Sequence, residues 1–356
     1  MPHHIFEKIS YFLLFTILAS TPLTANLQLE ACIDLDTLAV DYILETKRIH
    51  IPGYPNAFNP GIIRWHDSLL LSFRNIPNPL LSFNSNIGLI WLDEEFNPIG
   101  EPQLLETATP HTTIPSRAED ARLILIDDRL WMVYSDCKDV FVSKGGFRVY
   151  LGEITYDGKR FNLSNIEGLT QYEGESKSIR EKNWVPFNYN ETMLLAYSHI
   201  PHLIFKPIIG TGTCETIVST TPEINWEWGL IRGSTPGLII DDKYLAFFHS
   251  QIDLITTQSN EKKKAHYFMG AYTFNTSPPF EITHISPTPI LGKGFYDGNI
   301  YKPYWKPVNV VFPEGFVFND DYIWVSFGKH DHEAWIMKLD RKKLLDSLIP
   351  VQTSYD

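Results

Sequence analysis

The sequence is poor in the residues on which several common kinds of site depend. Its 356 residues contain three cysteines, Cys32, Cys137 and Cys214, whose spacing matches neither a zinc site nor a redox pair. Lysine and arginine number 30 against 42 aspartates and glutamates, which gives a formal net charge of -12. Because sequence-independent binding of nucleic acid depends on basic side chains that neutralise phosphates, we exclude nucleic acid as a partner.

Long apolar runs are also scarce. The apolar run at residues 9–20 is too short to cross a bilayer core of about 30 Å, and small residues follow it up to Ala25. This pattern predicts a signal peptide over residues 1–25 and a secreted or periplasmic protein whose residues 26–356 form a single domain. Lys8 is offset by Glu7 ahead of the run, which leaves an uncleaved anchor as the alternative.

Helical periodicity is weak along the whole chain. Only two short helices are expected, near residues 35–45 and 341–348. Aromatic residues make up 13% of the chain, and proline and glycine are abundant, as in proteins built from many short strands and turns. The composition therefore predicts an all-β protein.

The chain is rich in one repeated unit. A polar motif leads into an apolar strand, a tight turn follows, and a second apolar strand ends on polar residues. The five turns are His66-Asp67-Ser68, Asp127-Asp128, Asn188-Tyr189-Asn190, Asp241-Asp242 and Asn319-Asp320-Asp321. Successive turns lie roughly 50 to 80 residues apart, a period that suits four-stranded propeller blades. We therefore expect a five-bladed β-propeller.

The repeat also predicts where the polar residues meet. In an antiparallel pair joined by a short turn, the start of the first strand and the end of the second lie at the same edge of the sheet. Radial blades would bring these edges to one mouth of the central channel. The residues expected there are Asn59, Arg74, Glu119, Asp120, Arg122, Asp136, Lys182, Asn183, His199, Arg232, His249, His330 and Asp331.

The quartet Glu119-Asp120-Ala121-Arg122 carries the most chemistry. Neighbouring residues of a regular strand point to opposite faces, so one of the two carboxylates is expected to reach the channel while the other is held by its neighbours. Asp120 shares a face with Arg122. It is therefore either a positioned proton donor or half of a structural ion pair.

Three histidines and three cations reach the same predicted mouth. His199, His249 and His330 end equivalent strands, and are interpreted as metal ligands, as contacts to an anion or a sugar, or as hydrogen-bonded rim residues. Arg74, Lys182 and Arg232 either bind an oxyanion such as phosphate or pair with nearby carboxylates. Aromatic side chains suited to stacking on sugar faces are Trp184, Trp226, Trp228 and Tyr267.

Taken in order, these motifs resemble glycoside hydrolase family 130, a family of five-bladed propellers that cleave β-mannosides, mostly by phosphorolysis. The resemblance spans residues 59–339. Glu119-Asp120-Ala121-Arg122 is similar to the family's Glu-Asp-Pro-Arg motif. The other matching segments are Asn59-Pro60-Gly61, Ser72-Phe73-Arg74, Lys182-Asn183-Trp184, residues 232–249, residues 267–271 and residues 328–331.

The resemblance implies roles for individual residues. Asp120 would be the catalytic acid of an inverting phosphorolysis or hydrolysis of an oligosaccharide. The implied substrate contacts are Asn59, Arg74, Glu119, Arg122, Asp136, Asn183 and Asp331, and the implied phosphate contacts are Lys182, Arg232 and His249. No metal or organic cofactor is expected, and inorganic phosphate is a candidate co-substrate.

Four features depart from the family pattern. Ala121 replaces a proline, Phe268 replaces an arginine, and Lys182 stands where an arginine often holds phosphate. Ser234-Thr235 also interrupts the family's usual proline run. The fold expectation survives these changes, but the choice of reaction does not. Phosphorylase, hydrolase, β-mannosyltransferase and a non-catalytic carbohydrate-binding propeller all remain as hypotheses.

Overall fold

The computed structural model describes residues 32–78, 84–107, 116–137, 146–173, 180–298 and 309–354. The predicted signal peptide at residues 1–25 lies outside them. In this described part of the chain, no helix has the length and apolar character needed to cross a membrane.

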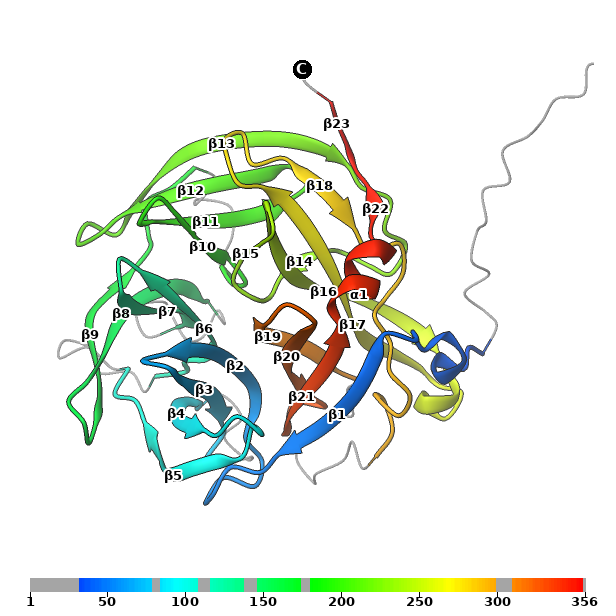
Figure 1. Ribbon diagram of the computed structural model, residues 1–356, viewed down its shortest axis with the longest axis horizontal. Coiled ribbons are helices and arrows are strands. Elements are labelled where there is room, and N and C mark those ends of the chain that lie inside the picture. The colour runs from blue at the N-terminus through cyan, green and yellow to red at the C-terminus, as the bar shows by residue number, and fades with distance from the viewer. Residues whose placement is uncertain are drawn as a thin grey trace, which may run out of the picture. The chain divides into compact units, whose positions relative to one another are not determined.

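Five antiparallel sheets form a ring (Figure 1). The first sheet consists of β2 (Phe58–Trp65), β3 (Ser68–Asn75), β4 (Asn86–Leu92) and β5 (Pro98–Leu104). The second consists of β6 (Glu119–Ile126), β7 (Arg129–Asp136), β8 (Arg148–Tyr156) and β9 (Phe161–Gly168). The prediction of a five-bladed β-propeller is confirmed.

The third and fourth sheets are joined at their outer edges by the C-terminal segment. The third contains β10 (Val185–Tyr189), β11 (Thr192–His199), β12 (His202–Ile208) and β13 (Thr213–Glu223). The fourth contains β14 (Arg232–Gly233), β15 (Leu238–Ile240), β16 (Lys243–Ile255), β17 (Lys263–Asn275) and β18 (Ile282–Ile285). At the chain's end, β22 (Ile349–Pro350) pairs with β18 and β23 (Gln352–Ser354) pairs with β13.

The fifth sheet is completed by the N-terminal part of the chain. It contains β19 (Val311–Phe318), β20 (Tyr322–Lys329) and β21 (Glu333–Asp340), and its outer strand is β1 (Ile43–Ile49). Arg48 lies opposite Trp335 and Ile49 opposite Ala334 in this pairing. The ring is therefore closed by a strand from the other end of the chain.

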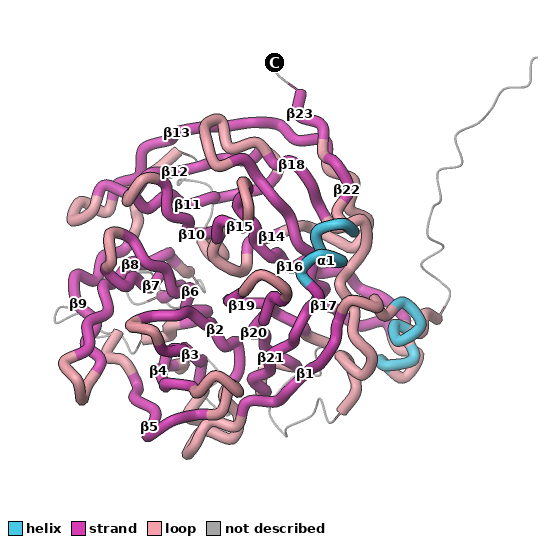
Figure 2. Tube along the Cα trace, viewed as in Figure 1, coloured by secondary structure: helices cyan, strands magenta, loops and turns pink. Residues whose placement is uncertain are grey.

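The prediction of a helix near residues 35–45 is mostly wrong. A single 3-10 turn, η1 (Leu35–Leu38), is capped by the Asp34 side chain, after which the backbone becomes extended and enters β1. The segment is extended because it pairs with the otherwise open edge of β21. The helix expected at the other end is present as α1 (Arg341–Ser347), where Asp340 caps the Lys343 amide at 2.9 Å. Figure 2 shows how little helix the ring contains.

Tight turns join the two inner strands of each blade as the repeat predicts, with one displacement. Asp127 and Asp128 both adopt left-handed φ angles, of 49° and 55°. In the third sheet the turn lies at Asn190 and Glu191 rather than one or two residues earlier. The reason is that Asn188 stays in β10 and donates its side-chain amide to the Leu125 carbonyl of the second sheet.

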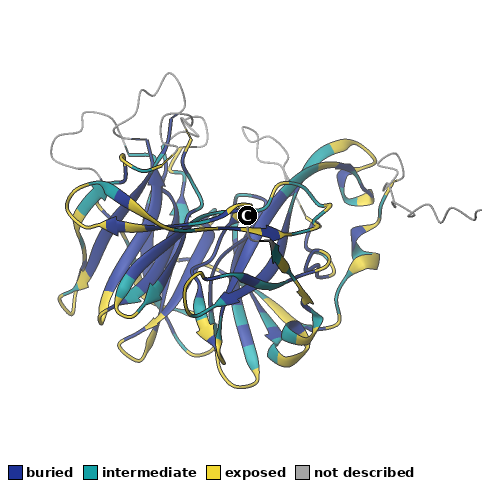
Figure 3. Cartoon of the chain, turned by 90° about the horizontal axis from the view of Figure 1, so that it is seen from above, coloured by how far each residue is buried: buried dark blue, intermediate teal, exposed yellow. Residues whose placement is uncertain are grey.

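The hydrophobic core is divided among the interfaces between neighbouring sheets. One cluster joins Ile63 and Leu70 of the first sheet to Leu123 and Met132 of the second. Figure 3 shows buried residues along the strands and exposed ones at the turns. The three cysteines are unpaired, with Cys32 exposed and the other two buried. This packing holds the five inner strand ends in fixed positions around the channel.

Candidate functional site

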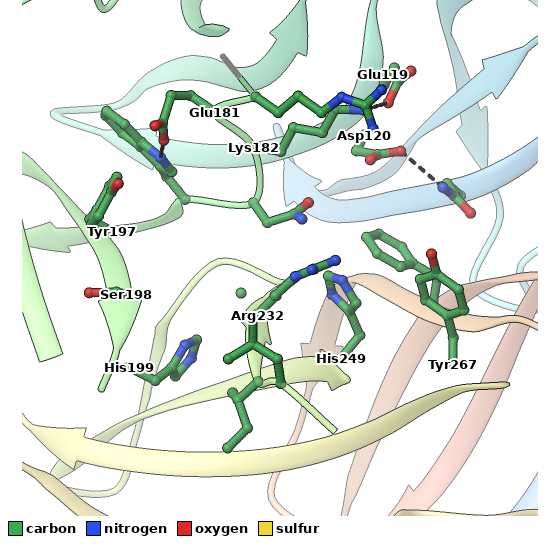
Figure 4. A pocket seen from close by; sticks show the side chains of 18 of the residues that line it. Glu119, Asp120, Glu181, Lys182, Tyr197, Ser198, His199, Arg232, His249 and Tyr267 are labelled. Carbon is green, nitrogen blue, oxygen red and sulfur yellow. Dashed lines mark hydrogen bonds and ion pairs between the residues drawn. The ribbon is translucent and has the colours of Figure 1, made fainter. Parts of the chain in front are cut away.

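The five inner strand ends surround one cavity of about 610 Å³ (Figure 4). All five blades contribute to its wall. The predicted residues that line it are Asn59, Arg74, Glu119, Asp120, Lys182, Asn183, His199, Arg232, His249 and Asp331. The convergence inferred from the repeat therefore holds for most of the residues that it named.

Asp120 reaches the cavity because the strand is irregular there. The register between β6 and β7 shifts between Glu119 and Arg122, and Asp120 has a φ of 57°. Asn59 stands at the corresponding irregularity of β2, with a φ of 44°. Bulges of this kind turn side chains away from the regular alternation. Both carboxylates of the quartet consequently line the cavity, contrary to the expectation for a regular strand.

The Asp120 carboxylate is almost buried and well held. Asn59 Nδ2 donates to its Oδ1 at 2.9 Å, and Arg74 Nη1 lies 3.7 Å from the same oxygen. Burial alone would raise the pKa of Asp120, but the charges of Arg74, Lys182 and Arg122 lower it below its ordinary value. The carboxylate is therefore ionised at neutral pH when the cavity contains no ligand.

Glu119 neutralises two of the cations that the sequence offers to an anion. Its Oε1 accepts from Arg74 Nη2 at 2.9 Å and its Oε2 from Lys182 Nζ at 2.5 Å. Lys182 also lies 3.5 Å from the centre of the Phe147 ring. From the sequence, either an oxyanion or a carboxylate could be the partner of Arg74 and Lys182. In the described structure each of them pairs with the carboxylate of Glu119.

Arg122 does not line the cavity but lies buried beneath it. Its Nη1 donates to the Asp120 carbonyl at 3.0 Å, its Nη2 to Asn183 Oδ1 at 3.2 Å, and its Nε to the Ser234 carbonyl. Glu314 Oε1 lies 3.6 Å from Nη1. One guanidinium thus connects four blades. It is a positioning residue for Asp120 and Asn183, where the sequence had suggested a substrate contact.

Asp136 and His330 are the other predicted residues that lie outside the cavity wall. Asp136 is fully buried and accepts from Ser116 Oγ at 2.6 Å and from the Arg117 amide at 2.9 Å. His330 Nε2 lies 3.2 Å from the Asp297 carbonyl. Both side chains hold loops in place, so the substrate role suggested for Asp136 has no support from its position.

Glu314 is the least compensated charge beneath the site. Within the described part of the chain, neither of its carboxylate oxygens has a hydrogen-bond partner. Burial raises its pKa well above the ordinary value, against the lowering effect of Arg122, whose N–H groups already have other acceptors. We therefore assign to Glu314 a raised pKa in the folded protein, which favours its neutral carboxyl form despite its proximity to Arg122.

This assignment predicts how Glu314→Gln changes stability. A carboxyl group whose pKa is raised on folding costs stability as pH rises from the unfolded pKa toward the folded one, by about 1.4 kcal/mol per pH unit. Glutamine removes that cost. The free energy of unfolding of the variant, relative to that of the wild type, should therefore increase between about pH 5 and pH 8. Urea unfolding at both pH values measures the gain. An equal loss at both values would instead identify Glu314 as the ionised partner of Arg122.

The pKa of Asp331 is displaced in the opposite direction from that of Asp120 in the same cavity. Burial, followed by the nearby carboxylates of Asp120 and Glu119, raises its pKa to about 6, against the lowering effect of Arg74. Two carboxyl groups with pKa values displaced in opposite directions are typical of sites that handle protons. Asp331 is therefore the cavity residue whose charge changes near neutral pH.

The family resemblance in the sequence implies a mannoside ligand, and the affinity for such a ligand should report this titration. An ionised carboxylate accepts stronger hydrogen bonds from sugar hydroxyls than a neutral one, so the Kd should rise about fivefold as pH falls from about 7.5 to 5. Asp331→Asn should bind weakly and almost independently of pH. Calorimetry with an uncleavable S-linked mannobiose measures both proteins. A wild-type Kd that stays constant over this range would contradict a role for Asp331 in sugar binding.

The two histidines in the cavity are neutral. Burial, followed by Arg122 and Arg232, lowers the pKa of His249 to about 3, and burial followed by His202 does the same for His199. The His249 Nδ1 lies 2.8 Å from Ser234 Oγ, and its ring stacks on Tyr267. These rings can offer hydrogen bonds to a ligand but no charge. Among the described residues, no group of three or more metal-binding side chains is placed to hold an ion.

Several lining residues were not predicted. Arg180 and Glu181 directly precede the Lys182-Asn183-Trp184 motif, and extending that polar motif would have found them. Ile200, Leu230 and Ile231 carry no polar signal and are placed only by the fold. Of the four aromatic residues suggested for stacking, Trp184 and Tyr267 line the cavity. Trp226 and Trp228 instead pack on Phe248 and Phe268.

The protein is a five-bladed propeller whose central cavity is lined by both acidic and basic side chains. No protein-family model matches the sequence, and no curated protein does. Solved structures match it. A β-1,2-mannobiose phosphorylase from Listeria innocua, in complex with β-1,2-mannobiose, has 15% sequence identity and a TM-score of 0.58, covering 85% of this chain and 93% of that one.

Two further structures extend the likeness. A mannose phosphorylase from Leishmania mexicana in complex with a phosphate ion has 11% identity and a TM-score of 0.57, covering 90% of this chain and 94% of that one. A structure from the GH130 family of mannoside phosphorylases, which contains hydrolases that target β-1,2-mannosidic linkages in Candida mannan, has 11% identity and a TM-score of 0.59 over 81% and 85%. The chain thus has the propeller fold of the GH130 structures.

Proposed function

We propose that this protein is an enzyme that cleaves or transfers β-mannosides with inversion, using Asp120 as the general acid. The observation that carries the proposal is the position of Asp120 in a 610 Å³ cavity, with Asn59 and Arg74 on its Oδ1. The fold match adds support, because proteins of this fold bind β-1,2-mannobiose and phosphate. Asn59, Arg74 and Asp331 would hold the mannosyl unit.

The proposed reaction needs a proton at the glycosidic oxygen. Asp120 gives its proton to that oxygen directly or through a sugar hydroxyl while the bond to the anomeric carbon breaks. An oxygen of water, phosphate or an acceptor attacks the same carbon from the opposite face and loses its proton. A bound sugar displaces the remaining water from Asp120, which raises its pKa and favours the protonated form that the reaction requires.

The second half of the cavity would hold the attacking oxyanion or the departing group. Arg232 is exposed there, and His249 contributes a neutral ring beside it. Lys182 is less suited to phosphate because Glu119 already neutralises it. Because of this ion pair, hydrolysis and transfer remain candidate reactions together with phosphorolysis.

A non-catalytic carbohydrate-binding propeller is the second candidate function. The observation that favours it is the lowered pKa of Asp120, which disfavours the protonated acid at neutral pH. The same contacts would then hold a sugar without cleaving it. Binding without turnover in the product assay would identify this function.

A product assay on residues 26–356 tests these alternatives. The substrates are β-1,2- and β-1,4-mannooligosaccharides, each with and without inorganic phosphate. Mannose 1-phosphate formed only with phosphate identifies a phosphorylase, and free mannose formed without it identifies a hydrolase. We also propose that the protein is exported with removal of residues 1–25. The mass of the mature chain tests this step.

A further inference from the structure

The wall of the cavity carries apolar as well as polar side chains. The side formed by the first, second and fifth sheets carries polar groups, among them Asn59, Asp120 and Asp331. The other side is formed by the end of β11 and the segment that leads into β14, and it presents three aliphatic side chains, Ile200, Leu230 and Ile231. We call these three residues the apolar lip.

Two of the three residues of the apolar lip are open to solvent, and Ile231 is partly buried. Ile200 is 53% exposed and Leu230 is 69% exposed, the largest exposed fraction among the large exposed hydrophobic residues of the described chain. A single exposed leucine on a protein surface is ordinary. Three aliphatic side chains on the wall of the cavity that also contains Asp120 are different, because ligand sites combine apolar walls with a few polar groups that fix orientation.

The chemistry of the apolar lip favours a particular kind of ligand. An unsubstituted sugar presents hydroxyl groups, which gain no hydrogen bond from isoleucine or leucine, and inorganic phosphate gains none either. An alkyl or acyl chain removes these side chains from water at no cost in unpaired polar groups. Arg232 follows Ile231 directly in the chain and also lines the cavity. Its guanidinium can therefore contact a polar group that joins such a chain to the sugar.

We propose that the substrate is a β-mannoside with an apolar aglycone, an alkyl or acyl chain that lies on the apolar lip. The inference rests on the proposed function and names the substrate class of the same site. The mannosyl unit lies against the polar wall, and Arg232 contacts the leaving group rather than a free phosphate. Water or an acceptor hydroxyl attacks the anomeric carbon as the bond from that carbon to the aglycone oxygen breaks. The aglycone oxygen takes the proton of Asp120, and the proton of the attacking hydroxyl passes to solvent.

Octyl and methyl β-mannosides test this proposal, with the octyl compound kept below its micelle concentration. Burial of a chain on the apolar lip should make kcat/KM about tenfold higher for the octyl compound, since each buried methylene favours binding. Leu230→Ser and Ile200→Ser should reduce this preference to about twofold or less, mainly by lowering kcat/KM for the octyl compound. Ile239→Ser is the matched control, because Ile239 is 50% exposed on β15 but does not line the cavity.

Binding of the same two compounds to Asp120→Asn, measured by calorimetry, separates this inference from the proposed function. Turnover of both compounds at equal rates would overturn the apolar aglycone and leave the enzyme standing. If the wild-type protein turns over neither compound but binds the octyl compound selectively, and this selectivity depends on Leu230, the result would support the apolar lip and count against catalysis. Binding without any preference, or no binding of either compound, would overturn the inference.

Discussion

Asp120→Asn should abolish nearly all turnover of β-mannosides, with a fall in kcat of about 10²–10⁴-fold, the range expected for loss of a positioned general acid. Asparagine has almost the same shape and can still accept the hydrogen bond from Asn59, but it has no proton to give to the glycosidic oxygen. Mannoside affinity should therefore change little. Initial rates and calorimetric titration on the same preparation measure the two quantities.

Asp128→Asn is the matched control for this substitution. Asp128 is exposed, lies in the tight turn of the same sheet, and does not line the cavity. Asparagine tolerates its left-handed backbone, so rate and stability should both remain at the wild-type level. Near-normal turnover by the Asp120 variant would rule out Asp120 as the acid. Loss of mannoside binding in that variant would identify it as a binding residue instead.

Arg122→Met should lower the free energy of unfolding by about 3–5 kcal/mol, as expected when one member of a buried, hydrogen-bonded charge network is removed. The guanidinium is fully buried, and its loss leaves the Asp120 and Ser234 carbonyls without their donor. Urea unfolding followed by circular dichroism measures the change. Turnover should fall as well, because Asn183 and the backbone of Asp120 lose a common support.

Arg129→Met provides the comparison. Arg129 pairs with Glu153 through its guanidinium, but about half of its side chain is exposed, so the loss should be about 0–1 kcal/mol. A similarly small loss for Arg122→Met would show that Arg122 does not stabilise the junction of the blades. A stable Arg122 variant with normal turnover would also remove its positioning role.

Much of the architecture could be predicted because it depends on local pattern. Each tight turn with its two flanking strands is encoded within about twenty residues, so the repeat revealed both the number of blades and the edge where polar residues gather. That is why Asn59, Asp120, Asn183 and Asp331 were correctly expected around one opening. The expected resemblance to GH130 is confirmed at the level of the fold.

The remaining features depend on contacts that no local pattern encodes. The helix expected near residues 35–45 overlapped the start of strand β1, whose partner, β21, lies almost 300 residues further along the chain. The bulge at Asp120 breaks the alternation on which the face assignment of Glu119 relied. Two of the acceptors of Arg122, Asn183 and the Ser234 carbonyl, lie about 60 and 110 residues away in the chain, so its sequence neighbours gave no sign that it joins several blades. The apolar lip likewise exists only where two blades meet.

The pairing of β1 with β21 also sets the order in which the molecule can be completed. A chain that emerges with its N-terminus first makes the closing strand before every other strand of the described residues, and the partner of that strand almost last. Until β21 arrives, β1 has no strand to pair with, and ring closure is a late, long-range step of the kind that slows folding. Cleavage after residue 25 would leave residues 26–42 ahead of β1, so maturation could precede or follow closure without touching the strand that performs it.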